Sequence, residues 1–197
     1  EEKMLAARQT LYGLNPPVSQ KMEIDYLVAQ ADLKRWDETA PDEGANRNAR
    51  IKATQSLEAY YQKNRNTKEA ARFNVQAAYN AAKMHRIGKD GKMKDWCSNT
   101  MKAFDSYKAS APTKDGKSET LGSIEADMAA ECAYRAIDED LKAKFDYETN
   151  HHRYAGTIDK VKLAFEKDLK EALDVWHPKL ETVITTYASP KWSVAAR

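Results

Sequence analysis

Apolar residues recur along this chain at spacings of three and four positions, which is the period of a helix with one buried face. Over residues 19–38 this face consists of Met22, Tyr26, Ala29, Leu33 and Trp36. The same period predicts further helices over residues 1–14, from about 48 to 66, from 67 to 87, over 93–109 and from 125 to about 147. The pattern therefore predicts a succession of amphipathic helices.

Prolines and glycines mark the turns between these helices. Two prolines in the sequence NPPVS end the first helix, because proline cannot continue one, and Ser19 is the predicted N-cap of the second. The glycines of GKDGK predict a turn before Met93. The sequence TNHHRYAG, residues 149–156, predicts a loop.

The last apolar pattern runs over residues 157–187, and its apolar residues share one stripe. Pro178 lies inside it and lacks a backbone donor, which predicts a kink or a division near His177. The sequence SPKW then predicts another helix, with Ser189 as its N-cap and Pro190 in its first turn.

Two segments resemble each other weakly and indicate an internal repeat. AARFNVQAAYNAA (residues 70–82) and EADMAAECAYRAI (residues 125–137) each carry a small residue two positions before a tyrosine. Small residues let a neighbouring helix approach closely, as in helix-turn-helix solenoids, although the offset of about 55 residues exceeds the roughly 34 of a tetratricopeptide unit. The predicted fold is all-α, with antiparallel helix-turn-helix pairs stacked as an irregular tetratricopeptide-like superhelix.

Composition supports this fold class. The 197 residues are 42% hydrophobic and 31% charged, with a mean hydropathy of −0.80, which suits helices that bury one face and solvate the rest. Seven glycines and six prolines are too few for a many-stranded sheet. We expect one domain over 1–197, with N-terminal helices in 1–45 and repeat-containing halves in 46–112 and 113–197.

Charge and hydropathy argue against two classes of partner. The 32 basic and 30 acidic residues are interspersed, and nucleic-acid binding proteins usually show a basic stripe or a strong excess. No run approaches the roughly 18 apolar residues of a membrane span, so no transmembrane segment is expected in this piece. The chain opens without methionine and stops within a helical pattern, from which we expect a fragment of a longer protein.

From Trp96 onward the residues are more specific than generic helix pairing. The segment beginning WCSNTMKAFDSYKASAP and the ending YASPKWSVAAR resemble the tetratricopeptide-like envelope proteins of the adventurous gliding-motility machinery of myxobacteria and their relatives. The resemblance covers mainly residues 96–197. It implies a non-catalytic scaffold in the periplasm or at the outer membrane, with other envelope motility-complex proteins as partners and no cofactor.

Cys97 and Cys132 are the two cysteines and lie on helices expected to pack side by side. A disulfide needs α-carbons within roughly 7 Å, which adjacent antiparallel helices supply. In the periplasm that the resemblance implies, pairing is the expected outcome. The alternatives are two separate buried thiols that act as small hydrophobes, and a cytoplasmic tetratricopeptide adaptor in which both stay reduced.

The alternate helices around residues 70–85 and 125–140 are expected to line an extended binding groove. The candidate partner-binding residues on these helices are Tyr79, Lys83, Tyr134 and Arg135.

Two other chemistries are weighed against simpler interpretations. His151 and His152 could reach one metal ion from their loop, but without an i, i+4 pair or a C-x-x-C motif a hydrogen-bonded loop pair is favoured. A run of carboxylates is better explained as exposed i, i+4 ion pairs than as acid/base groups: Glu166, Asp168, Glu171 and Asp174. An enzyme is the least favoured class, because no nucleophile, base and orienting group are legible together.

Overall fold

The computed structural model describes residues 2–111, 113–114 and 117–196. Glu1, Arg197 and the expected boundary at Pro112 lie outside these residues. The described chain is helical except for one antiparallel ladder, in which β1 (Thr113–Lys114) pairs with β2 (Lys117–Ser118). The predicted all-α class is confirmed.

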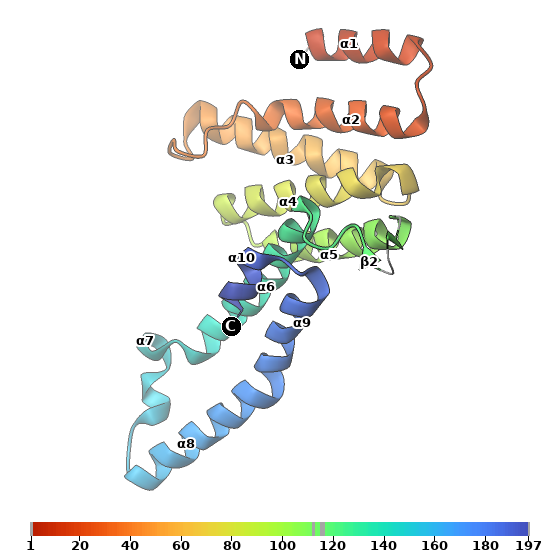
Figure 1. Ribbon diagram of the computed structural model, residues 1–197. Helices are drawn as coiled ribbons and strands as arrows, with labels where there is room; N and C mark the ends of the chain where they lie inside the picture. Colours follow the sequence, from red (N-terminus) through yellow and green to blue (C-terminus); the bar gives the residue numbers. More distant parts are fainter. Residues whose placement is uncertain (1, 112, 115–116, 197) are drawn as a thin grey trace.

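The first helices lie in space in the order of the sequence. Each contacts the next, and α2 also contacts α4 while α4 contacts α6. Figure 1 shows α1 to α5 as successive layers. Their bounds are α1 (Glu2–Gly13), α2 (Val18–Leu33), α3 (Gly44–Asn64), the 3-10 turn η1 (Lys68–Ala70), α4 (Ala71–Gly88), α5 (Met93–Ser110) and α6 (Ile124–Phe145).

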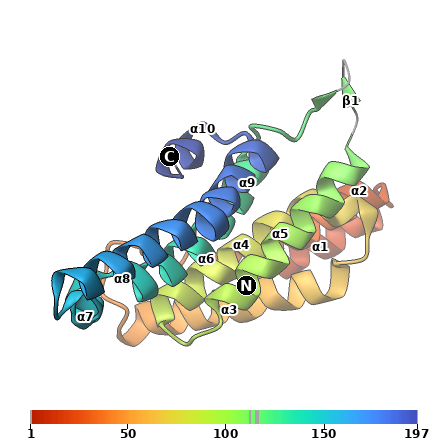
Figure 2. The same ribbon diagram turned by 90° about the horizontal axis from the view of Figure 1, so that it is seen from below.

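The second half of the chain returns along α6. In Figure 1 the far end of α6 and the helix α8 project away from the stacked layers, while α9 and α10 pack back against α6. Figure 2 shows the β1–β2 ladder projecting at the opposite end from α7 and α8. These elements are α7 (Tyr147–Asn150), the 3-10 turn η2 (His151–Tyr154), α8 (Ile158–Glu171), the π turn η3 (Ala172–Trp176), α9 (His177–Tyr187) and α10 (Pro190–Ala195).

Small residues form the centre of the core, as the two similar segments predict. Ala77 and Ala81 of α4 and Ala129 and Ala130 of α6 are fully buried. Side chains of this size let the helix axes approach closely, and larger aromatic rings fill the space beside them. The closest ring contacts are Tyr26–Phe73, Tyr61–Trp96, Phe104–Tyr187 and Tyr134–Trp192.

The second helix is shorter than the periodicity predicts. It ends at Leu33, so Trp36 lies outside it. Beyond this point the side chain of Asn46 accepts a hydrogen bond from the backbone N–H of Asp37 at 2.8 Å and donates to its carbonyl at 3.0 Å. Such bonds compete with helix formation and end the helix early. Ser19 is also not the N-cap, because α2 begins at Val18.

The division near His177 is confirmed, but it is preceded by a feature that periodicity does not encode. The chain passes from α8 through the π turn η3, where the backbone N–H of His177 bonds to the carbonyl of Ala172. Ser189 caps α10 as predicted, accepting from the N–H of Trp192. Residues 149–156, predicted as a loop, instead fall largely within α7 and η2.

The stripe over residues 157–187 is exposed in its first half and buried near its end. Ile158, Phe165 and Leu173 are 85%, 58% and 59% exposed, whereas Val183 and Tyr187 of α9 are buried. The helical period shows that these residues share a face, but not whether another element covers that face. Here α9 contacts α6 along the body of the molecule, and α8 lies on the projecting part.

Candidate interaction surfaces

Glu131 on α6 is the centre of a cluster that joins α6 to α4. Its carboxylate accepts a hydrogen bond from Tyr79 Oη at 2.7 Å and one from Arg135 Nε at 2.6 Å, and Arg86 Nη1 lies 3.9 Å away. We call these four residues the Glu131 cluster. It brings together Tyr79 and Arg135, two of the residues predicted to bind a partner.

The electrostatics of this cluster keep Glu131 charged. Burial raises the pKa of Glu131. The hydrogen bonds from Tyr79 and Arg135 lower it by more, so the pKa of Glu131 lies below its ordinary value. Burial, with the neighbouring carboxylate, raises the pKa of Tyr79. A neutral tyrosine therefore donates to a charged carboxylate across the α4–α6 contact.

The remaining two candidates are also engaged within the chain. Lys83 Nζ lies 2.8 Å from Glu38 Oε2 and 5.5 Å from the centre of the Trp36 ring. The ring of Tyr134 packs on Trp192 of α10, with ring centres 5.4 Å apart. A partner that used these groups would have to displace these contacts. The space enclosed between α4 and α6 here is only about 10 Å³.

Glu125, at the start of α6, makes a second polar contact with α4. It is 2% exposed and accepts hydrogen bonds from Arg72 Nε at 2.8 Å and from Gln76 Nε2 at 2.5 Å. Burial raises the pKa of Glu125, but these two hydrogen bonds outweigh it and the pKa is lowered. The α4–α6 contact thus contains one buried carboxylate, Glu125, and one partly buried carboxylate, Glu131, and both are charged when the chain is folded.

The structure brings the two cysteines together. Cys97 on α5 and Cys132 on α6 are both buried, and both are free thiols. The neighbouring Cys97 thiol, followed by burial, raises the pKa of Cys132 well above its ordinary value. Cys97 Sγ also lies 3.5 Å from the sulfur of Met93. The two thiols are neighbours, and the disulfide stays a prediction.

The two histidines of the 149–156 segment lie side by side at the surface. Their ring centres are 6.3 Å apart and the ring planes are nearly perpendicular. His151 Nδ1 lies 3.0 Å from the backbone carbonyl oxygen of Glu148. Within the parts of the chain that the structure describes, no group of three or more His, Cys, Asp or Glu side chains is arranged to hold a metal ion.

Asp168 departs from the exposed ion-pair pattern predicted for α8. It is buried, and its carboxylate pairs with Arg153 and accepts a hydrogen bond from Tyr154 Oη at 2.6 Å. Lys162 and Glu166 do form the expected i, i+4 contact, at 3.8 Å. The exposed interpretation is therefore wrong for Asp168, because η2 folds back against α8 and covers it.

His85 of α4 is buried between two carboxylates. Its Nδ1 lies 2.6 Å from Asp90 and its Nε2 lies 2.7 Å from Glu58, while its ring stacks on Trp96. Both ring nitrogens therefore lie within hydrogen-bond distance of a carboxylate oxygen. The histidine connects α3, α4 and the turn that follows α4, which is a structural role.

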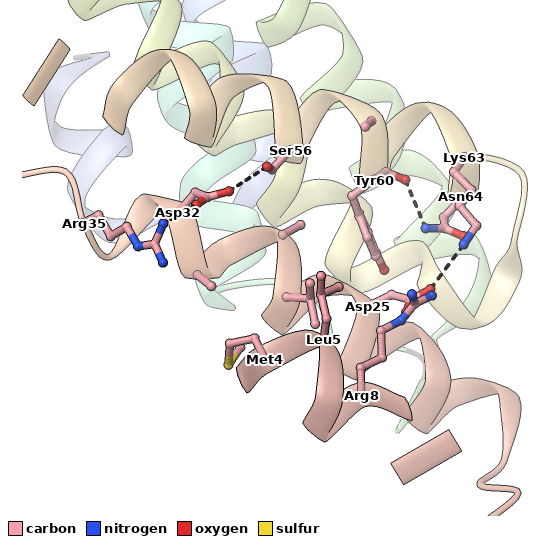
Figure 3. Close-up of a pocket in the computed structure, with 14 residues that line it drawn as sticks. Met4, Leu5, Arg8, Asp25, Asp32, Arg35, Ser56, Tyr60, Lys63 and Asn64 are labelled. Carbon is pink, nitrogen blue, oxygen red and sulfur yellow. Dashed lines mark hydrogen bonds and ion pairs between the residues drawn. The ribbon is translucent and has the colours of Figure 1, made fainter. Parts of the chain in front are cut away.

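A groove that the sequence analysis missed lies between the first three helices. It encloses about 280 Å³, has an apolar middle, and carries charged groups at both ends (Figure 3). We call it the α1–α3 groove. Its lining residues are Met4, Leu5, Arg8, Asp25, Val28, Ala29, Ala31, Asp32, Arg35, Ser56, Ala59, Tyr60, Lys63 and Asn64.

Asp25 is the buried charge at one end of this groove. It pairs with Arg8 Nε at 2.6 Å and Lys63 Nζ at 3.4 Å, and Tyr12 Oη donates to it at 2.8 Å. Burial raises the pKa of Asp25, but its hydrogen bonds with Arg8 and Tyr12 lower it below the ordinary value. In the sequence, the feature that could have predicted this site is a carboxylate on the apolar face of α2, seven residues before Asp32.

Comparisons of the chain with family models, curated proteins and solved structures found no match. None of the helices that the structure describes is long and apolar enough to cross a bilayer.

Proposed function

We propose that this chain is a non-catalytic scaffold for protein–protein interaction, built as an irregular tetratricopeptide-like superhelix. The observation that carries the proposal is the helix arrangement. Helices α2, α4 and α6 adjoin one another, and the intervening helices α3 and α5 complete antiparallel pairs with them. Stacking of this kind is typical of repeat proteins, which present extended surfaces to partners.

Exposed apolar side chains support a role in binding. Leu27 on α2 and Ile51 on α3 are large and exposed, and the apolar stripe on α8 is longer still. Single exposed apolar residues are normal, but a continuous stripe is typical of an interaction surface. The polar groups of the α4–α6 contact are paired with one another, which supports a structural rather than a chemical role for them.

The proposed setting is a cell-envelope complex of the gliding-motility type. This part rests on the resemblance of residues 96–197, and the adjacent cysteines fit an oxidising compartment. A cytoplasmic tetratricopeptide adaptor with reduced thiols is the competing setting.

Crosslinking in the native cells tests the function and its setting together. A photo-crosslinking amino acid at Leu27 and one at Leu173 are expected to capture envelope proteins, because both positions are exposed. The same group at Lys108, an exposed polar position on α5, is the control. Capture of cytosolic proteins alone would overturn the envelope setting, and equal capture at all three positions would contradict a defined binding surface.

A further inference from the structure

The α2 wall of the α1–α3 groove has a regular order of residue types. Asp25, Val28, Ala29 and Asp32 stand at positions i, i+3, i+4 and i+7, which share one face of a helix. Two carboxylates therefore lie about 10 Å apart along α2, at a rise of 1.5 Å per residue, with apolar side chains between them.

The α3 wall repeats this spacing in the opposite direction. Ser56, Ala59, Tyr60 and Lys63 also stand at i, i+3, i+4 and i+7. Because the helices are antiparallel, Lys63 meets the Asp25 end of α2, and Ser56 Oγ donates to the carboxylate at the other end at 2.9 Å. The groove is thus polar at two ends, and apolar over the two helical turns between them.

Helix α1 supplies a third wall that is only lightly packed. Met4 and Leu5 remain 37% and 42% exposed above the apolar middle, and no residue of α1 is buried. Figure 3 shows Leu5 beside Tyr60 and Met4 farther toward the Asp32 end, with Arg8 at the Asp25 end and Arg35 at the other. The apolar middle therefore stays accessible, although α1 lies across it.

The carboxylates of the groove, Asp25 and Asp32, already accept hydrogen bonds from groups of this chain. Its cationic side chains have further N–H groups that can donate to a partner. Asp25 is bound by Arg8, Tyr12 and Lys63. Arg8 donates to Asp25 through Nε and also contacts Tyr12, and a guanidinium carries five N–H groups in all. Lys63 has a side chain 64% exposed, so this end presents positive charge to the solvent.

The Asp32 end of the groove also has a carboxylate paired with cations of this chain. Asp32 accepts from Ser56 and pairs with Arg35 at 3.3 Å and Lys52 at 3.8 Å. The Arg35 side chain is 51% exposed and touches the carboxylate through Nη1. Three cations and two carboxylates line the groove, so it fits an apolar group that carries a negative charge on each side.

The volume fits a side chain rather than a large ligand. An apolar cavity of about 150 Å³ accommodates benzene, so about 280 Å³ accommodates one or two bulky apolar side chains. The distance between the charged ends, about two turns of α2, is also two turns of any helix laid along it.

We infer that the α1–α3 groove binds an acidic amphipathic helix of a partner protein. That helix carries Asp or Glu at positions i and i+7 and a bulky apolar residue at i+3 or i+4. The acids meet Arg35 at one end and Arg8 with Lys63 at the other, and the apolar residue enters between Met4, Leu5 and the α3 wall. The inference rests on the proposed scaffold function and names the partner chemistry of one surface.

A designed peptide tests this directly. The probe is a fluorescein-labelled Ala-based helix with Glu at i and i+7 and Leu at i+3 and i+4. The control peptide has the same composition, with both Glu residues moved to the opposite face. Fluorescence anisotropy is expected to show saturable binding of the probe, weaker at high salt because exposed ion pairs are screened, and at least roughly tenfold weaker binding of the control.

Variants of the full chain locate the binding. Ala59→Trp fills the apolar middle from an exposed position on α3, and Arg35→Glu reverses the charge at one end. Each is expected to raise the Kd by roughly tenfold or more. Lys108→Glu makes the same charge change on α5, away from the groove, and is expected to leave the Kd unchanged. Circular dichroism of each variant checks that the fold is retained.

Several outcomes would overturn the inference. These are no saturable binding up to about 1 mM peptide, equal binding of the two peptides, or an unchanged Kd in Ala59→Trp. Dimerisation of the chain alone that Ala59→Trp abolishes would identify a second copy as the occupant, and would also overturn it. If Ala59→Trp still captures the same partners by crosslinking in cells, this site is wrong and the scaffold function stands.

Discussion

At the scale of single residues, the sequence pattern does not predict which charged side chains lie inside the fold. Glu125 and Glu131 lie on a helix that also carries the exposed carboxylates of Glu139 and Asp140, and nothing in their spacing distinguishes them. Their burial depends on Arg72, Gln76 and Tyr79, which come from α4, about 50 residues away in the sequence. Periodicity predicts faces within a helix, and it does not predict which side chains another helix brings to them.

Acid is expected to weaken the α4–α6 contact. Glu125 and Glu131 have pKa values lowered in the folded chain, so their stabilisation is fully present above the unfolded pKa of about 4.3 and is lost as pH falls through the folded values. The free energy of unfolding, measured with urea between pH 7 and pH 3, should therefore fall in this range. Glu131→Gln should flatten the fall, whereas the exposed control Glu139→Gln should not. Equal slopes in all three proteins would contradict the assignment.

At the scale of elements, the sequence analysis succeeds where a local rule is strong. Pro178 marks the division at His177, and Ser189 caps the last helix. The sequence analysis fails where the contact with a second element determines whether a side chain is buried. The apolar stripe of α8 is exposed because no helix that the structure describes covers it. The polar ends of the α1–α3 groove are set by cations from α1, from α3 and from the turn after α2.

The small-residue face of α6 is expected to tolerate no added volume. Ala130→Leu places three extra carbons where α4, α5 and α6 meet, and overpacking of this kind costs about 1–3 kcal/mol. Urea unfolding measures this loss. Ala143→Leu, at an exposed position of the same helix, is the matched control and should change stability by less than about 0.5 kcal/mol. If Ala130→Leu lowered the free energy of unfolding by as little as Ala143→Leu, the helices would have to separate to make room for the larger side chain.

The exposed stripe of α8 should contribute little to stability. Phe165→Ser in α8 and Leu173→Ser in the adjoining η3 are each expected to change the free energy of unfolding by less than about 0.5 kcal/mol, since neither side chain is buried. Trp176→Ala, one turn further along, removes a buried ring and should cost about 3–5 kcal/mol. Comparable losses at Phe165 and Trp176 would mean that α8 faces inward after all.

At the scale of the whole molecule, whether the two cysteines are oxidised or reduced indicates the cellular compartment in which the protein folds. Protein purified from an oxidising compartment is expected to contain a disulfide between Cys97 and Cys132. This would close a loop of about 35 residues and add about 3–4 kcal/mol to stability. Intact mass under non-reducing conditions, lower by two hydrogens than after reduction, measures it. Cys132→Ala should abolish the difference. Two free thiols in that material would refute the disulfide and weaken the envelope setting.

The order of packing has a mechanical consequence. Helices α1 to α5 mostly contact their neighbours in the sequence, so force applied to the two ends would pass through each interface in turn. Loss of one end helix then leaves the interfaces further along intact, because each unit is held mainly by adjacent ones. Under tension we therefore expect such a chain to lengthen in steps, one end helix at a time, and to keep the rest of its fold.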